Sequence, residues 1–548
     1  MGNDTANAGS SNITNNFGAN THFHANTSAL NATITNNDGG GVSFAGHSTA
    51  ANAVITNKVG GGTNFFEQAT AGNASITSSA NTFMQFGFEG FHPVTDTATA
   101  GNSTITTNGT VTFFSSTTAG NAIITASNGG NVRFFEASSG GNAQFITNSG
   151  GTIDISNLKL AGTTAGSIAG GGEYRLGSKR LTVGSNNLST EVSGSINDGG
   201  FPSGGTGGSL VKVGTGTLTL SGANGYTGGT TISAGTLQLG NGGTSGSIVG
   251  NVVDNGVFAI NRSDTFTFGS RISGSGAFRQ LGAGVTILTD INSYTGGTTI
   301  AAGTLQLGNG GTSGSIVGNV LNNATFAIKR SNAFSFSGVI SGSGAFQQLG
   351  TGTTTLTALE SYSGLTSIAA GKLALFGAGN IASSSGVVAN GVFDISGVSG
   401  AGTSVQSLSG AGSVALGAKT LTLTNASGDF AGAIGGTGSF TLAAGKEMLS
   451  GVSTYTGATN VNAGTLSVNG SIASSSLTTV NAGGTLGGNG TVGNTTINGG
   501  TLAPGNSIGT LAVQGNLVFT AAASYMVEVS PANADRTNVT GTATLGGA

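Results

Sequence analysis

The hydrophobic and polar positions of roughly the first 155 residues repeat with a period of 21 residues. One repeating position is aliphatic and a second is phenylalanine. Both series skip once between residues 77 and 104, which predicts a single insertion of about eight residues at that point. The aliphatic series runs through Ile13, Ile34, Ile55, Ile76, Ile105 and Ile124 to Phe145, and the second series runs through Phe23, Phe44, Phe65, Phe86, Phe113 and Phe134 to Ile155.

Each repeat consists of short alternating runs, such as Ala32-Thr33-Ile34-Thr35, separated by Gly, Asn and Ser. Thr, Ile, Val and Phe favour strands, whereas Gly and Asn tolerate the positive φ of sharp corners. No stretch has a convincing helical period. A unit of this length cannot bury its own apolar face, so neighbouring units must stack. The pattern therefore predicts an all-β parallel β-helix in which the recurring Ile and Phe line up inside.

A longer repeat of 68 residues begins at about residue 211. The segment YTGGTTISAGTLQLGNGGTSGSIVGNV at 226–252 returns at 294–320 and differs only at Ser233 and Ala301. Tyr362 begins a degenerate third copy and Tyr455 a fourth. Because 68 residues correspond to about three rungs of the shorter period, both regions fit one elongated rod.

These repeats predict the core and the division of the chain. We expect residues 1–160 and 211–459 to form the two repeat regions. A charged stretch with Glu173, Arg175 and the loop at Gly199–Gly208 predicts junction rungs over 161–210. The predicted core includes Ile34, Phe44, Ile55, Phe65, Ile76, Phe258 and Phe326.

Composition excludes several classes of protein. Of 548 residues, 103 are Gly and only 6% are charged, and the net charge is −3. So few basic residues cannot provide the positive surface that nucleic acid requires. The absence of Cys excludes disulfides, thiolate metal sites and a cysteine nucleophile. Charge-driven disorder is not expected, because 36% of the residues are hydrophobic.

The YTGGTTI–AGTLQLG unit resembles the autotransporter-associated β-strand repeat of bacterial type V secreted proteins. GGTLAPGNSIGTLAVQGNLVF at 499–519 and the following segment at 525–547 resemble the end of such passenger domains. The resemblance implies a right-handed parallel β-helix at the bacterial cell surface or outside the cell, exported across the outer membrane. It also implies a C-terminal β cap over 460–548 that starts folding outside the cell.

Neither a signal peptide nor a membrane β-barrel is recognisable in this sequence. We expect the signal peptide and the β-barrel to lie outside this sequence. The outer-membrane β-barrel of the same protein would then be the first partner of the chain.

Three histidines are weak candidates for a metal site. His22 and His24 flank Phe23, so in a strand they would share an outward face. His47 lies on the next rung, about one position out of register. An exposed pair near the chain end is the favoured explanation, and we expect no cofactor.

The insertion contains MQFGFEGFHPVTDT at 84–97. Insertions in solenoids project as loops, and loops carry recognition. Phe88, Glu89, Phe91 and His92 are therefore the candidates for a contact loop. A loop that folds back over the solenoid is the alternative.

Catalysis is not expected. Asp38, Asp154, Asp254 and Asp394 are scattered, whereas glycan-cleaving β-helix enzymes need carboxylates that meet on one face. Glu67 and Glu89 are 22 residues apart, but Glu89 lies inside the insertion.

The sequence thus favours a non-catalytic passenger for adhesion, aggregation or biofilm formation, with surface glycans, proteins or a second copy as partners. A structural stalk for an upstream module and a polysaccharide-active enzyme are the alternatives. Ice binding would require outward Thr-x-Thr columns, and Thr217 and Thr219 do not recur in this way from rung to rung.

Overall fold

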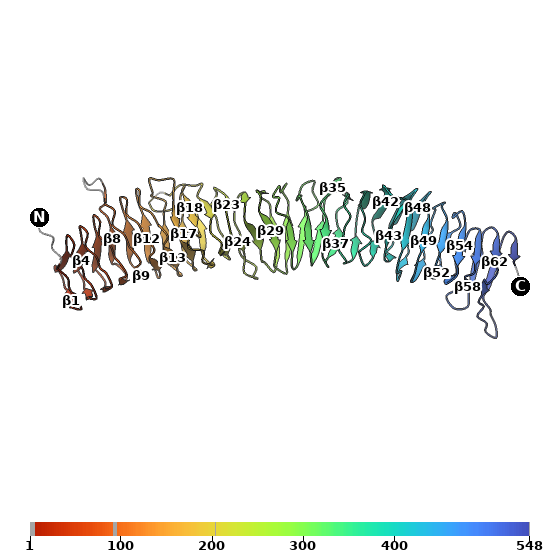
Figure 1. Ribbon diagram of the computed structural model, residues 1–548, viewed down its shortest axis with the longest axis horizontal. Helices are drawn as coiled ribbons and strands as arrows, with labels where there is room; N and C mark the ends of the chain where they lie inside the picture. The colour runs from red at the N-terminus through yellow and green to blue at the C-terminus, as the bar shows by residue number, and fades with distance from the viewer. Residues whose placement is uncertain (1–5, 91–95, 203, 547–548) are drawn as a thin grey trace. The chain divides into compact units, whose positions relative to one another are not determined.

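A computed structural model describes residues 6–90, 96–202 and 204–546. The expectation of an all-β parallel β-helix is confirmed, because strands of successive rungs pair in parallel and stack into long sheets (Figure 1). No helix that could cross a membrane occurs among the described residues. The chain divides into two units, residues 1–264 with 270–283 and residues 265–269 with 284–548.

The first unit begins with two long sheets. The threonine sheet contains β1 (Asn12–Asn15), β3 (Thr33–Asn36), β5 (Val54–Asn57), β7 (Ser75–Ser78), β9 (Thr104–Thr107), β11 (Ile123–Ala126), β13 (Gln144–Thr147) and β16 (Ser167–Ala169). The phenylalanine sheet contains β2 (Asn20–Phe23), β4 (Gly41–Phe44), β6 (Gly62–Phe65), β8 (Phe83–Phe86), β10 (Thr110–Phe113), β12 (Asn131–Phe134), β14 (Thr152–Asp154), β17 (Glu173–Arg175) and β20 (Ser195–Asn197).

The remaining strands of the first unit form two further stacks. One contains β15 (Gly162–Ala165), β18 (Arg180–Val183), β21 (Ser209–Lys212), β23 (Thr230–Ile232), β25 (Val252–Asp254) and β28 (Ile272–Ser273). The other contains β19 (Thr190–Val192), β22 (Thr217–Leu220), β24 (Thr236–Leu239), β26 (Val257–Ile260) and β29 (Ala277–Gln280).

The second unit is built in the same way. Its first stacks are β27 (Thr265–Phe268), β30 (Val285–Leu288), β32 (Thr304–Leu307), β34 (Thr325–Ile328), β37 (Ala345–Gln348), β39 (Thr366–Ile368), β41 (Val387–Ala389) and β44 (Leu408–Ser409); β31 (Thr298–Ile300), β33 (Val320–Asn322) and β36 (Ile340–Ser341); and β35 (Phe334–Phe336), β38 (Thr353–Leu356), β40 (Lys372–Gly377), β42 (Val392–Val398), β45 (Ser413–Gly417) and β48 (Ala433–Gly436).

Three more stacks follow towards the end of the chain. They are β43 (Gly402–Val405), β46 (Thr420–Leu423), β49 (Phe440–Leu442), β51 (Thr459–Val461), β54 (Thr478–Asn481), β57 (Thr495–Asn498), β60 (Leu517–Phe519) and β63 (Ala543–Leu545); β47 (Asp429–Phe430), β50 (Lys446–Leu449), β52 (Gly464–Val468), β55 (Gly484–Gly488), β58 (Thr501–Pro504) and β61 (Ser524–Tyr525); and β53 (Ser471–Ile472), β56 (Thr491–Val492), β59 (Thr510–Val513) and β62 (Arg536–Val539).

Columns of identical side chains fill the interior of the first rungs, up to β12. In the phenylalanine sheet, the rings from Phe23 to Phe134 stack with centroids 4.6–4.8 Å apart and nearly parallel planes. This spacing matches the distance between paired strands, so each ring can contact the rings above and below. In the threonine sheet, Ile34, Ile55 and Ile76 are fully or almost fully buried.

The interior also contains a polar ladder. The buried amide of Asn15 donates to Asn36, and that of Asn36 donates to Asn57, each at 2.8 Å. Asn57 donates in turn to Ser78 Oγ at 3.0 Å. Buried amides are tolerated because each finds its partner on the next rung.

The 68-residue repeats place a buried tyrosine in every copy. The hydroxyls of Tyr226, Tyr294, Tyr362 and Tyr455 each lie 2.7 Å from the hydroxyl of the threonine four residues later. All four rings are at most 1% exposed. Phe258 and Phe326 occupy equivalent buried positions in β26 and β34.

Candidate functional site

The outward face of the threonine sheet carries an uninterrupted threonine column. Strand pairing places Thr14 beside Thr35, and the same register continues up to β11. The insertion does not break this register, because Ile76 pairs with Ile105 across it. The column consists of Thr14, Thr35, Thr56, Thr77, Thr106 and Thr125, all exposed or half-exposed.

Two further columns lie beside it. One contains the exposed residues Thr33, Val54, Ser75, Thr104 and Ile123. The other is an exposed asparagine ladder from Asn31 to Asn121, whose amides donate from rung to rung at 3.0–3.3 Å. Its members are Asn31, Asn52, Asn73, Asn102 and Asn121. We call these three columns the neutral face, because none of their side chains is charged or aromatic.

The neutral face adds to the conclusion from the sequence. A single column of outward threonines recurs from rung to rung, whereas Thr-x-Thr pairs occur in these columns only at Thr33 with Thr35 and at Thr104 with Thr106. Thr217 and Thr219 are not part of this arrangement.

The histidines lie near the start of the first unit. His22 and His24 are both exposed, and their rings stack with centroids 5.8 Å apart. His22 Nδ1 lies 2.5 Å from Ser43 Oγ, and His47 is exposed in a turn of the next rung. The described residues contain no group of three or more His, Cys, Asp or Glu that could hold a metal ion.

The contact-loop residues are only partly visible. Phe88 is half-buried and stacks on Phe66 at 4.1 Å, and Glu89 is exposed. Phe91 and His92 lie outside the described residues. The buried carboxylate of Asp96 accepts hydrogen bonds from the backbone N–H groups of Phe88, at 2.7 Å, and of Glu67. Sequence reasoning did not single out Asp96, which anchors this loop to the preceding rung.

Acidic side chains of the first unit support turns. Glu67 accepts a hydrogen bond from the N–H of Gly46 at 2.7 Å, and Glu136 accepts one from Ser115 at 2.9 Å. Each accepting carboxylate belongs to the rung that follows the rung of its donor in the chain. Asp154 similarly accepts from the N–H groups of Ser156 and Phe201, both at 2.9 Å. These carboxylates thus accept hydrogen bonds from backbone N–H groups and stabilise turns.

In the second unit, Asp394 forms an ion pair with Lys372 at 2.9 Å. Burial alone would raise the pKa of Asp394, but hydrogen bonds from Ser396 and Lys372 outweigh it and lower the pKa. This carboxylate is therefore held in its charged form by its neighbours.

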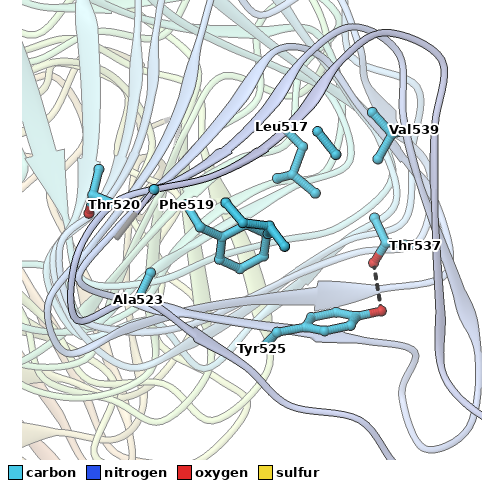
Figure 2. Close-up of a pocket in the computed structure, with 10 residues that line it drawn as sticks. Leu517, Phe519, Thr520, Ala523, Tyr525, Thr537 and Val539 are labelled. Carbon is cyan, nitrogen blue, oxygen red and sulfur yellow. Dashed lines mark hydrogen bonds between the residues drawn. The ribbon is translucent and has the colours of Figure 1, made fainter. Parts of the chain in front are cut away.

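An apolar cavity of about 610 Å³ lies among the last strands of the second unit (Figure 2). Leu517, Phe519 and Val539 line it, and the hydroxyl of Tyr525 lies 3.2 Å from Thr537 Oγ1. Phe519 pairs in register with the buried Ile497 of the preceding rung. The cavity therefore continues the apolar interior of the solenoid, and none of its lining residues is acidic, basic or histidine.

Comparison with known proteins identifies the longer repeat. The Passenger-associated-transport-repeat matches residues 210–239, 278–307, 346–375 and 435–468, and each match contains one of the buried tyrosines. No solved structure matches the chain.

The chain is also similar to the adhesin BmaC autotransporter of Brucella suis biovar 1 (strain 1330). The two are 35% identical over 244 residues, which cover 36% of this chain and 7% of that protein. The chain thus spans a small part of the length of this relative. The chain therefore contains four passenger-associated transport repeats and is similar, over part of its length, to an autotransporter adhesin.

Proposed function

We propose that this chain is a non-catalytic, surface-exposed adhesin-like passenger that makes contact through the neutral face. The observation that carries the proposal is the in-register stack of threonine and asparagine columns over β1 to β11. Hydroxyls, amides and methyl groups at a fixed spacing offer many weak and identical contacts. Such contacts gain strength when several engage at once.

The chemistry of the face favours an uncharged partner. Hydroxyl and amide groups can both donate and accept, which suits surface glycans and the polar side chains of proteins. A second copy of the chain presents the same groups and is the third option. A similarity to an adhesin-named autotransporter and the use of acidic side chains in turns both favour binding over catalysis.

The test compares two doubly substituted proteins. Thr56→Lys with Thr106→Lys places charge on the neutral face, in β5 and β9. Asn64→Lys with Thr112→Lys places the same charge on the outward face of the phenylalanine sheet, in β6 and β10. We expect the first pair to weaken binding to bacterial or host cell surfaces and the second pair to leave it unchanged. Equal binding by both would refute the assignment of the face.

Ice binding is a second candidate, favoured specifically by the threonine column. A flat array of threonines presents methyl and hydroxyl groups at the regular spacing of the strands. Thermal hysteresis of the purified chain, abolished by the Thr56→Lys and Thr106→Lys pair, would support it. Ordinary freezing behaviour would exclude it without affecting the adhesive role.

Export is proposed to occur through the chain's own outer-membrane barrel, with residues 460–548 folding first. Each rung contacts only its neighbours, so folding that starts at one end can propagate. Deleting residues 460–548 should slow refolding of the remainder or reduce its protease resistance. An unaffected remainder would contradict the proposal.

A further inference from the structure

Two buried carboxyl groups stand where other copies of the 68-residue repeat have amides. Asp254, in β25, is fully buried and corresponds to Asn322 in β33. Glu360 is 2% exposed and occupies the position of Asn224 and Asn292, two residues before the buried tyrosine. The repeats therefore provide an internal comparison between an acid and an amide in one environment.

Asp254 reproduces half of the hydrogen bonds of Asn322. Asp254 Oδ1 accepts from the N–H of Gly256 at 3.0 Å, as Asn322 Oδ1 does from Ala324 at 3.2 Å. The amide nitrogen of Asn322 also donates to the backbone carbonyl of Ala345 at 2.8 Å. In the first unit Ala277 is the equivalent of Ala345, but Asp254 Oδ2 is buried and has no hydrogen-bond partner.

Glu360 shows the same pattern. Its Oε2 accepts from the N–H of Ile340 at 2.6 Å, just as Asn224 Oδ1 accepts from Ile196 at 2.9 Å. The amide nitrogen of Asn224 donates to the carbonyls of Gly222 and Ser247, both at 3.0 Å. Glu360 Oε1 is buried without a partner.

The backbone supplies the carbonyl that Glu360 would need. The N–H of Asn224 donates to Ser247 O, and that of Glu360 donates to Asn380 O at 2.9 Å. The corresponding isolated bridges join Ala223 to Ser247 and Leu359 to Asn380. The Asn380 carbonyl is thus the counterpart of the one that accepts from the Asn224 amide.

An ionised oxygen can only accept a hydrogen bond, and beside a carbonyl it would be repelled. A protonated oxygen can donate, as the amide does. We propose that Asp254 and Glu360 are proton-binding sites: in the folded protein at mildly acidic pH each is a neutral carboxylic acid that donates to a backbone carbonyl in place of an amide. The acceptors are Ala277 O and Asn380 O.

The surroundings favour the neutral form. Burial raises the pKa of Asp254 to about 6, more than the N–H groups of Gly256 and Phe258 lower it. Burial likewise raises the pKa of Glu360 to about 7, with a smaller lowering by the N–H of Ile340.

Few charged or titratable groups face the two acids. Ile232 pairs with Asp254, and Lys212 follows one rung further in the same inward column. The Lys212 ammonium group donates to the carbonyls of Val213 and Gly214 at 2.7 and 3.1 Å. Near Glu360, burial and, to a smaller extent, the charge of Glu360 raise the pKa of the Tyr362 phenol. The Tyr362 hydroxyl forms a hydrogen bond with Thr366.

The two sites make local stability depend on pH. The folded chain retains each proton to a higher pH than the unfolded chain, so the stabilisation is complete below the unfolded pKa. It is lost as pH rises from 3.8 to about 6 at Asp254 and from 4.5 to about 7 at Glu360. Within each window, the local unfolding equilibrium should shift up to about tenfold towards the open state per pH unit.

The experiment uses the full chain and the variants Asp254→Asn and Glu360→Gln. Hydrogen exchange, corrected for the intrinsic effect of pH, should show protection around β25 and β36 falling as pH rises through each window in the unsubstituted protein. The profile around the substituted site should become flat in each variant. Glu528→Gln, which changes an exposed acid of the second unit, is the control and should change neither profile.

Infrared difference spectra provide an independent readout. At about pH 5.5, the C=O band of a protonated carboxylic acid should be present and should lose intensity in each variant. If Glu360→Gln folds poorly, Glu360→Asn copies the side chain of the other repeats. An unchanged pH profile in both Glu360 variants and in Asp254→Asn, or spectra without the protonated band, would overturn the proposal.

Discussion

Removal of one ring from the phenylalanine column tests how the interior holds the rungs together. Phe86 is fully buried in β8, and its ring stacks on Phe65 at 4.8 Å and on Phe113 at 4.6 Å. Phe83 lies on the same strand but is 68% exposed. Phe86→Ala and Phe83→Ala therefore delete the same atoms from opposite faces of one strand.

The structure gives the expected size of the two effects. Burial of a Phe side chain contributes about 1.5–3 kcal/mol, and each ring contact adds about 0.5–1.5 kcal/mol. Phe86→Ala loses both contacts and leaves a cavity that the stacked backbones cannot close, so we expect a cost of about 3–5 kcal/mol. Phe83→Ala should change stability by no more than about 0.5 kcal/mol.

Hydrogen exchange of the full chain is the appropriate assay because it resolves individual rungs. In a solenoid each rung contacts only its neighbours, so Phe86→Ala should reduce protection in β6, β8 and β10. Protection in β46 and β49 of the second unit should remain unchanged. Equal effects of the two substitutions, or a uniform loss across both units, would refute the column as a local source of stability.

Three further substitutions test other parts of the fold. Asn57→Leu should cost about 2–4 kcal/mol, measured by exchange in β3 and β7, because it removes the oxygen that accepts from the buried Thr63 hydroxyl and leaves the Asn36 amide with the Gly62 carbonyl in place of two acceptors. Unchanged exchange in β3 would contradict the role of the ladder. Arg330→Ala should speed proteolysis within 309–313, because the Arg330 guanidinium donates to the carbonyls of Gly314 and Thr312 at 2.7 and 2.5 Å. Lys329→Ala, which changes the exposed neighbouring residue, should leave the rate of proteolysis unchanged. Burial, with a smaller contribution from Asp429, raises the pKa of Glu447 to about 8, so the stability of its rung should fall as pH rises from 4.5 to about 8. Exchange around β50 should lose this dependence in Glu447→Gln, and a dependence that persists would assign it to another group.

The parts of the fold that follow from strict repetition could be predicted from sequence. A period of 21 residues with Ile and Phe at fixed places leaves few alternatives to stacked rungs, because each unit is too short to bury these side chains alone. The repeated YTGGTTI segment marks the second repeat for the same reason.

Features that depend on pairing between rungs could not be predicted. The threonine column is an exception, because the step from Ile76 to Ile105 in the repeat already places Thr77 beside Thr106 across the insertion. Asp96 and Glu136 stabilise N–H groups that lie many residues earlier in the chain. The likeness of Asp254 to Asn322 is visible in the aligned repeats, but its meaning depends on the carbonyl that faces the side chain.

The distribution of charge connects stability with binding. Carboxylates such as Glu67 and Glu136 accept from backbone N–H groups at turns, outside the three uncharged columns of the neutral face. A neutral face has no long-range attraction for a partner, so its affinity must come from several rungs that engage together. Loss of one rung in the middle of the threonine column should therefore weaken binding more than loss of one at its edge, because it divides the contact into two shorter stretches. Thr77→Lys against Thr14→Lys measures this difference, and equal losses would show that the rungs bind independently.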